Sequence, residues 1–213
     1  MYDIIFLFSK IGNNVAILSM FLPLIADFFA RRKKIEYSND LKIFALFYYY
    51  SCIIQLIASI LAKVFHSHNL FIFHFYLPIQ IVAISYLLLK WLGLKKNVVL
   101  LLAAFFGLIT FSGDLYFSSL NEYPYFMLWF NISVLLVLSF ILSYSNDKRK
   151  IHLPCEFNYI HIGIYVYSII TLIGLSPAHT DFRVYGYFFH AMASTISYYF
   201  FMRSFRCLYH KNG

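Results

Sequence analysis

Three side chains that could do acid–base or metal chemistry lie within apolar stretches of this sequence: His74, Asp114 and His190. Histidine titrates near neutral pH, and two histidines with one carboxylate are a ligand set found in catalytic metal sites. No H-x-x-x-H or H-E-x-x-H spacing places two ligands on one helix face, so a metal site would need three separate helices to meet. The same three groups could serve as acid and base without a metal.

The elements that must position these residues are long hydrophobic segments. Hydrophobic residues make up 62% of the chain and charged residues only 12%, a composition typical of a polytopic membrane protein. About 20 apolar residues match a hydrocarbon core of about 30 Å. We therefore expect an all-α bundle of seven transmembrane helices forming one domain over residues 1–213. The expected spans are 4 or 11–30, 41–65, 69–90, 97–119, 123–144, 157–175 and 181–208.

The basic residues predict how this bundle lies in the membrane. Fourteen of the 17 Lys and Arg residues occupy alternate connections or their flanks, namely Arg31, Arg32, Lys33, Lys34, Lys42, Lys90, Lys95, Lys96, Lys148, Arg149, Lys150, Arg203, Arg206 and Lys211. This positive-inside pattern predicts an external N-terminus and a cytoplasmic C-terminus. The net charge of +8 then reflects topology and contact with anionic lipid, and no direct nucleic-acid binding is expected. The basic connections also offer a surface for a cytoplasmic protein partner.

The three cysteines do not suggest cysteine chemistry. Cys52 lies inside an expected span, whereas Cys155 and Cys207 fall in cationic segments on the expected cytoplasmic side. There is no C-x-x-C pair, and disulfides are rare in reducing compartments. The sequence therefore predicts no disulfide.

The expected topology places several polar residues in the outer half of the membrane. Counting about 1.5 Å per residue from the outer end of each span gives about 7 Å for His74 and Asp114, about 12 Å for His190 and Asn131, and about 15 Å for Gln55 and Gln80. Pro78 also leaves the carbonyl of His74 without its helical donor. Such residues either line a polar cavity facing outward or hydrogen-bond across helices and hold the bundle together, and the sequence leaves both open.

One stretch of the chain resembles a known group of membrane proteins. The run N-L-F-I-F-H-F-Y-L-P-I-Q from Asn69 to Gln80 resembles the third-span signature, N-L-x-x-x-H-x-Y-x-P-I-E, of a group of small seven-span membrane proteins of Bacteroidota. Further positions that fit this group's patterns are Gly163, Tyr167, His190 and Tyr198. Two positions depart from the patterns, because Gln80 replaces a carboxylate and Ser194 replaces an asparagine. The resemblance implies the seven-span fold, residence in a bacterial inner membrane and no particular activity. By size, topology and composition the chain is also similar to membrane accessory proteins encoded beside RNA-targeting CRISPR effectors.

Three functions remain as hypotheses. The first is a non-enzymatic sensor or accessory protein without a cofactor. The second is an intramembrane lipid hydrolase that uses His74, His190 and Asp114, with a metal or as acid and base. The third is a transporter or a pore formed by a homo-oligomer, although few polar residues lie in the inner half of the expected bundle.

Overall fold

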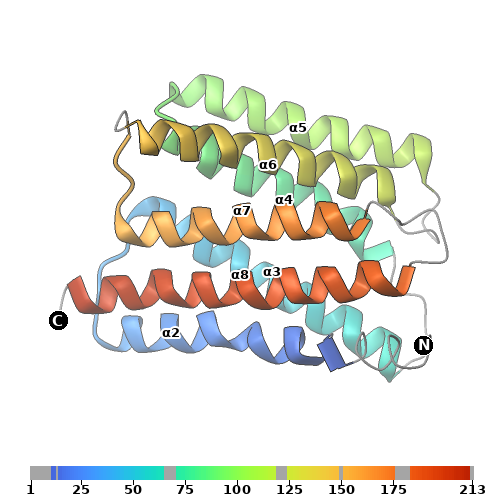
Figure 1. Cartoon of the computed structure of the whole chain (residues 1–213), viewed down its shortest axis with the longest axis horizontal. Helices are drawn as coiled ribbons and strands as arrows, with labels where there is room; N and C mark the ends of the chain where they lie inside the picture. The colour runs from blue at the N-terminus through green and yellow to red at the C-terminus, as the bar shows by residue number, and fades with distance from the viewer. Residues whose placement is uncertain are drawn as a thin grey trace. The chain divides into compact units, whose positions relative to one another are not determined.

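The computed structural model describes residues 11, 12, 14–64, 71–118, 124–148, 151–175 and 183–211, and every regular element in this part of the chain is helical. The helices are α2 (Phe21–Arg32), α3 (Asn39–Lys63), α4 (Phe71–Trp91), α5 (Lys96–Phe117), α6 (Tyr125–Asp147), α7 (Cys155–Leu175) and α8 (Arg183–Lys211), as Figure 1 shows.

Six of the described segments are long and apolar enough to cross a membrane: Asn14–Arg32, Asn39–Leu61, Phe71–Trp91, Lys96–Phe117, Phe126–Asp147 and Cys155–Gly174. The prediction of an all-helical, multi-pass membrane protein is confirmed at this level. The helix expected as the seventh span, α8, is 29 residues long but is not one of the six. The earlier of the two expected starts of the first span, Ile4, lies outside the described residues.

The helices belong to two compact units. One unit comprises Met1–Glu36 with His152–Gly213 and contains α2, α7 and α8, and the other comprises Tyr37–Ile151 and contains α3 to α6. A single domain over the whole chain stays a prediction.

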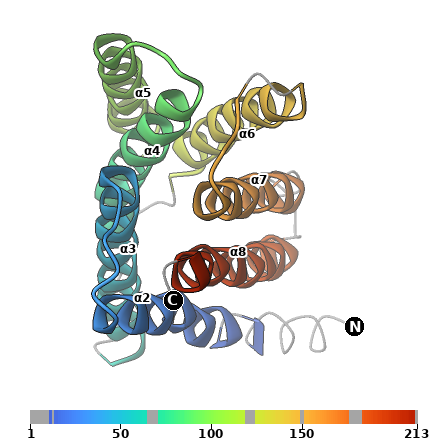
Figure 2. The same cartoon turned by 90° about the vertical axis from the view of Figure 1, so that its left-hand side faces the viewer.

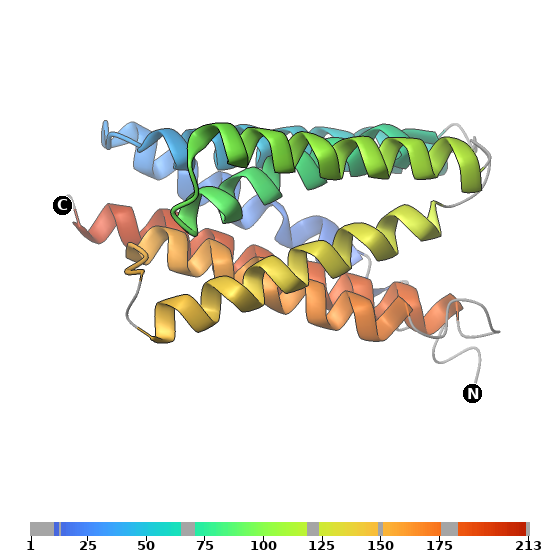
Figure 3. The same ribbon diagram turned by 90° about the horizontal axis from the view of Figure 1, so that it is seen from above.

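In the unit of α3 to α6, α4 packs against each of the other three helices. Figure 2 shows α4 between α3 and α5, and Figure 3 shows α6 inclined to α5. Aromatic rings join α3 to α4, since Tyr76 stacks on Phe47 and Tyr50 at centroid distances of 6.4 and 6.1 Å. The backbone of α5 approaches α4 closely at Gly107, where a Cβ atom would lie 2.4 Å from the side chain of Val82. Of the six apolar segments, α4 has the largest buried share.

In the other unit, α8 packs against both α2 and α7 (Figure 2). Glycines on α7 permit this contact, because a Cβ atom at Gly163 would lie 2.6 Å from the ring of Phe201. The carbonyl of Gly163 also accepts a hydrogen bond of 2.8 Å from the hydroxyl of Ser197 on α8. Small residues allow helix backbones to approach one another in just this way in membrane bundles.

The prediction that the protein has no disulfide is wrong. Cys155, the first residue of α7, is bonded to Cys207 in the last turns of α8, with 6.3 Å between the Cα atoms. These residues meet because α7 and α8 follow one another in the chain and run antiparallel side by side (Figure 3), which brings the start of one to the end of the other. The separation lies within the range that a disulfide can bridge. Cys52 is buried and takes no part in this disulfide.

Candidate functional site

His74 and Asp114 form a buried pair between α4 and α5. The Nδ1 atom of His74 lies 2.5 Å from Oδ2 of Asp114, and only 3% of His74 and 4% of Asp114 remain exposed. The two residues meet because α4 and α5 are consecutive antiparallel helices, so the first turn of α4 faces the last turn of α5. The tautomer of the imidazole decides which group carries the proton between them.

Two acceptor atoms of the predicted polar cluster are buried and lack a hydrogen-bond partner within the described residues. They are Oδ1 of Asp114, the oxygen that does not face His74, and Oε1 of Gln80, which lies further along α4. A buried acceptor without a partner is costly and is uncommon in native structures. The carboxylate therefore retains the capacity to accept one more hydrogen bond or a proton.

Asn131 links three helices beside this pair. It is fully buried on α6, its Nδ2 donates to the carbonyl of Leu77 on α4 at 2.9 Å, and its Oδ1 accepts from the hydroxyl of Thr110 on α5 at 2.7 Å. Thr110 is one helical turn from Asp114, and Leu77 is about one turn from His74. The sequence analysis identified Asn131 but not Thr110. The spacing of four residues between Thr110 and Asp114, which puts both on one face of a helix, could have pointed to it.

The other predicted residues have no described contact with this pair. His190 is half-buried on α8, in the other unit, where its ring meets the edge of Tyr167 at 5.7 Å and its carbonyl accepts from the hydroxyl of Ser194 at 2.9 Å. Tyr198 contacts Phe201 along the same helix, with ring centroids 6.4 Å apart. Gln55 is half-buried on α3, and Pro78 lies within α4. Because His190 and His74 belong to separate units, their meeting stays a prediction.

The geometry bears on the metal hypothesis. Within the residues whose positions are described, no group of three or more His, Cys, Asp or Glu side chains is placed to hold a metal ion. The pair of His74 and Asp114 supplies two such groups, whereas catalytic zinc sites use three protein ligands. The pair can do proton chemistry without a metal, because an imidazole and a carboxylate in contact can exchange a proton and bind another.

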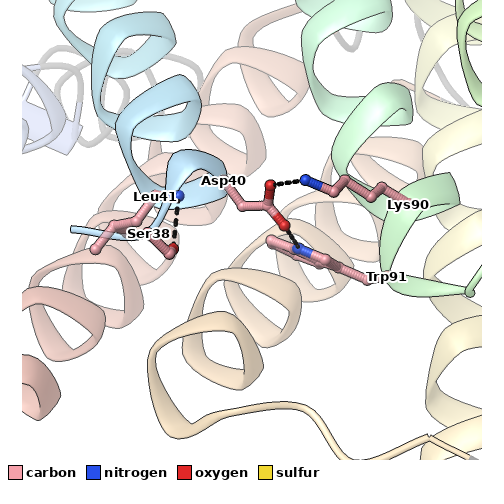
Figure 4. Close-up of polar contacts among 5 residues, drawn as sticks. All are labelled: Ser38, Asp40, Leu41, Lys90 and Trp91. Carbon is pink, nitrogen blue, oxygen red and sulfur yellow. Dashed lines mark hydrogen bonds and ion pairs between the residues drawn. The ribbon is translucent and has the colours of Figure 1, made fainter. Parts of the chain in front are cut away.

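A second polar cluster joins the ends of α3 and α4 (Figure 4). Asp40, in the first turn of α3, forms an ion pair with Lys90 and accepts a hydrogen bond of 3.2 Å from Nε1 of Trp91. Ser38 caps the same helix by accepting from the backbone N–H of Leu41 at 3.3 Å. We call Asp40, Lys90 and Trp91 the Asp40 cluster. Asp40 is 8% exposed, so its two donors offset the cost of burying its charge.

Comparisons of the chain with protein-family models, with curated proteins and with solved structures found no match. The resemblances drawn from the sequence therefore stay predictions. Any function has to follow from the contacts of the residues themselves.

Proposed function

We propose that this protein is a non-enzymatic sensor of the bacterial inner membrane, in which protonation of the His74–Asp114 pair alters the packing of α4. The observation that carries the proposal is the 2.5 Å contact between these two buried side chains, together with a second carboxylate oxygen that has no hydrogen-bond partner in the described part of the chain. Ionisable groups inside a membrane are costly and commonly serve proton or ligand functions.

The pair can exist with two different net charges. With one titratable proton shared between the imidazole and the carboxylate, the pair is neutral, either as two neutral groups or as an ion pair. With one proton fewer it carries a net charge of −1. Burial makes the cost of that charge depend on the surrounding packing, so the neutral and charged pairs favour different arrangements of α4 and α5. The neighbouring groups on α5 and α6, Thr110 and Asn131, are uncharged.

A single helix connects the pair to the expected cytoplasmic side. The α4 helix carries His74 in its first turn and Lys90 in its last, about 24 Å apart at about 1.5 Å per residue. The far end is fixed to α3 by the Asp40 cluster (Figure 4). A movement of α4 would thus reach the basic connections, where a cytoplasmic protein partner would read it.

The proposed topology has seven crossings, with α8 as the last. The basic residues support it, because their alternation between the two sides continues to the end of the chain. Six crossings, with the final helix lying outside the membrane, would not require that alternation. Polar residues make α8 less apolar than the other helices, and some of them face protein, as Ser197 and Ser204 are buried. A helix packed between α2 and α7 needs less lipid-facing surface than one at an edge.

The sensor can be tested with tryptophan fluorescence. Trp91 belongs to the Asp40 cluster, and it is the single tryptophan left in a Trp129→Phe background. In lipid nanodiscs, we expect the emission of Trp91 to change reversibly as the pH is varied, if protonation of the pair alters the packing of α4. Asp114→Asn, which keeps the shape of the side chain but removes its charge, should abolish the change.

The matched control is Asp27→Asn, which neutralises another buried carboxylate, one paired with Arg31 at 2.8 Å on α2. This variant should titrate like the parent. Circular dichroism of each variant shows whether the helices are retained. The sensor proposal would be overturned if the emission of Trp91 depended on pH in the same way in the parent and in Asp114→Asn. It would also be overturned if the emission of the parent did not depend on pH.

One observation favours a second candidate, a metal-independent intramembrane lipid hydrolase. Asp114 contacts Nδ1 of His74, and a histidine oriented in this way uses its Nε2 atom as the general base. This is the relation between aspartate and histidine in hydrolase triads. Against it, His74 is 3% exposed, so a substrate would reach it only after the helices separate. Release of fatty acid from phospholipid by the purified protein, lost in His74→Gln, would favour the hydrolase.

A further inference from the structure

The disulfide of Cys155 and Cys207 conflicts with the side of the membrane on which the basic residues place both cysteines. Lys148, Arg149 and Lys150 precede Cys155, and Arg203, Arg206 and Lys211 surround Cys207 in the sequence. Under the proposed topology both cysteines lie on the cytoplasmic side. Thiols are kept reduced in that compartment, and the disulfides that do form there are usually transient or regulatory.

We propose that Cys155 and Cys207 are a reversible thiol–disulfide switch on the cytoplasmic side of the membrane, closed by exchange with a low-molecular-weight disulfide such as oxidised glutathione. The inference rests on the proposed topology but not on the His74–Asp114 pair. The bonded state is the one that the structure contains.

The exposure of the two residues suits exchange. Cys155 is exposed, and Cys207 is half-buried next to the exposed Arg206. Cys155 begins α7, where backbone N–H groups favour negative charge, and Arg206, next to Cys207 in the sequence, adds a positive charge to the same turn of α8. Glu156, which is buried beside Cys155, acts in the opposite direction. A reactive thiol needs both access and stabilisation of its thiolate, and Cys155 is the more accessible of the two.

The exchange takes place in two displacements. The thiolate of Cys155 attacks the small disulfide, forms a mixed disulfide and releases one small thiolate. The thiolate of Cys207 then attacks the sulfur of Cys155 and expels the second small thiolate. Two electrons pass from the protein dithiol to the small disulfide, and the two protons lost by the cysteines end on the two small thiols.

The remaining contacts between α7 and α8 do not depend on this bond. The hydroxyl of Ser197 binds the carbonyl of Gly163 near the middle of the pair, and Arg203 donates to the hydroxyl of Tyr159 at 3.2 Å. The reduced protein should therefore stay folded with α7 and α8 packed. The bond fixes only the ends of the two helices, next to the basic segments that face the cytoplasm.

The test counts free thiols in living cells. The full chain is expressed in a Cys52→Ser background, so that only the pair can react. Cells are quenched in acid and treated with a maleimide that adds a large mass to each thiol. We expect two tags per chain in untreated cells, none after a brief treatment with a thiol oxidant, and two again after a reductant. In nanodiscs, the tagged fraction should fall reversibly from two to none as oxidised glutathione is raised against reduced glutathione.

Three results would overturn the switch. No tags in untreated cells would make the bond permanent, and two tags after oxidation would mean that it does not form. If the thiols react with the maleimide only after a chelator is added, they hold a metal ion and not a disulfide. The spacings His152-x-x-Cys155 and Cys207-x-x-His210 are suitable for such a site.

A fluorescent protein fused to the C-terminus separates failure of the switch from failure of the topology. Fluorescence indicates a cytoplasmic C-terminus, so a permanent bond in a fluorescent fusion contradicts the switch alone. A permanent bond in a dark fusion whose full-length chain is detected in the membrane contradicts the topology as well. A Cys155→Ser variant, which carries one cysteine of the pair, should give one tag in untreated cells.

Discussion

Replacing Asn131 with leucine tests whether one amide holds three helices together. The amide nitrogen donates to Leu77 and the amide oxygen accepts from Thr110, so the change removes a link from α6 to α4 and another from α6 to α5. Hydrogen bonds between helices in membranes contribute about 0.6 kcal/mol on average and at most about 1.7 kcal/mol. Leucine is at least as large as asparagine, so little cavity is left.

The two bonds do not count equally. The hydroxyl of Thr110 has one proton, which it shares between Asn131 and the carbonyl of Phe106 at 2.9 Å. When the amide is removed, the hydroxyl of Thr110 can donate fully to the carbonyl of Phe106, and this stronger bond offsets part of the lost stability. We therefore expect the free energy of unfolding to fall by about 1 kcal/mol, most of it from the lost bond to Leu77.

The assay is reversible unfolding in mixed detergent micelles, followed by circular dichroism. A cycle of Asn131→Leu, Thr110→Val and the double variant gives the coupling between the two side chains, expected at a few tenths of a kcal/mol. The reasoning is refuted if Asn131→Leu leaves the free energy of unfolding unchanged or raises it. Additive effects of the two changes would refute the link between α5 and α6 alone.

The other predictions concern packing, turn geometry and the Asp40 cluster. Gly163→Val should lower the free energy of unfolding by about 1–3 kcal/mol, because its side chain would meet Phe201 on α8, and denaturation should show this. Gly93→Ala should lower the free energy of unfolding by about 1 kcal/mol, because the φ angle of Gly93 is 78° and a residue with a side chain rarely adopts it. No atom lies close enough to obstruct the added methyl group, so the whole effect comes from the backbone conformation. Trp91→Phe should lower the free energy of unfolding by about 1 kcal/mol, because the hydrogen bond to Asp40 is lost. The decrease should be smaller in an Asp40→Asn background, where the acceptor is no longer charged.

The helices were predictable because hydrophobic length and charged ends both mark a membrane span. The expected span 69–90 became α4, Phe71–Trp91, and the expected span 97–119 became α5, Lys96–Phe117. The equal depth of His74 and Asp114 followed from the same count along the helices. Their contact, seen in the structure, also depends on rotation about each helix axis, which a depth count does not include.

What the sequence did not predict depends on which helices are neighbours. The disulfide was missed because the cysteines were judged by compartment and motif, whereas the antiparallel pairing of α7 and α8 brings them together. Thr110 was missed because a threonine can satisfy its hydroxyl on its own helix, so its spacing from Asp114 does not by itself indicate the bond to Asn131. The polar residues of α8, such as Ser197, lower its apolarity for a reason that appears only once its neighbours are known.

The Asp40 cluster also has a consequence for how the chain enters the membrane. Asp40 begins α3, but its partner Lys90 comes 50 residues later, at the end of α4. At a synthesis rate of about 5–20 residues per second, the carboxylate waits roughly 3–10 s before Lys90 exists. Until then Asp40 lacks the ammonium group that pairs with it in the folded protein. The contact that joins the start of α3 to the end of α4 can therefore form only after both helices have been synthesised.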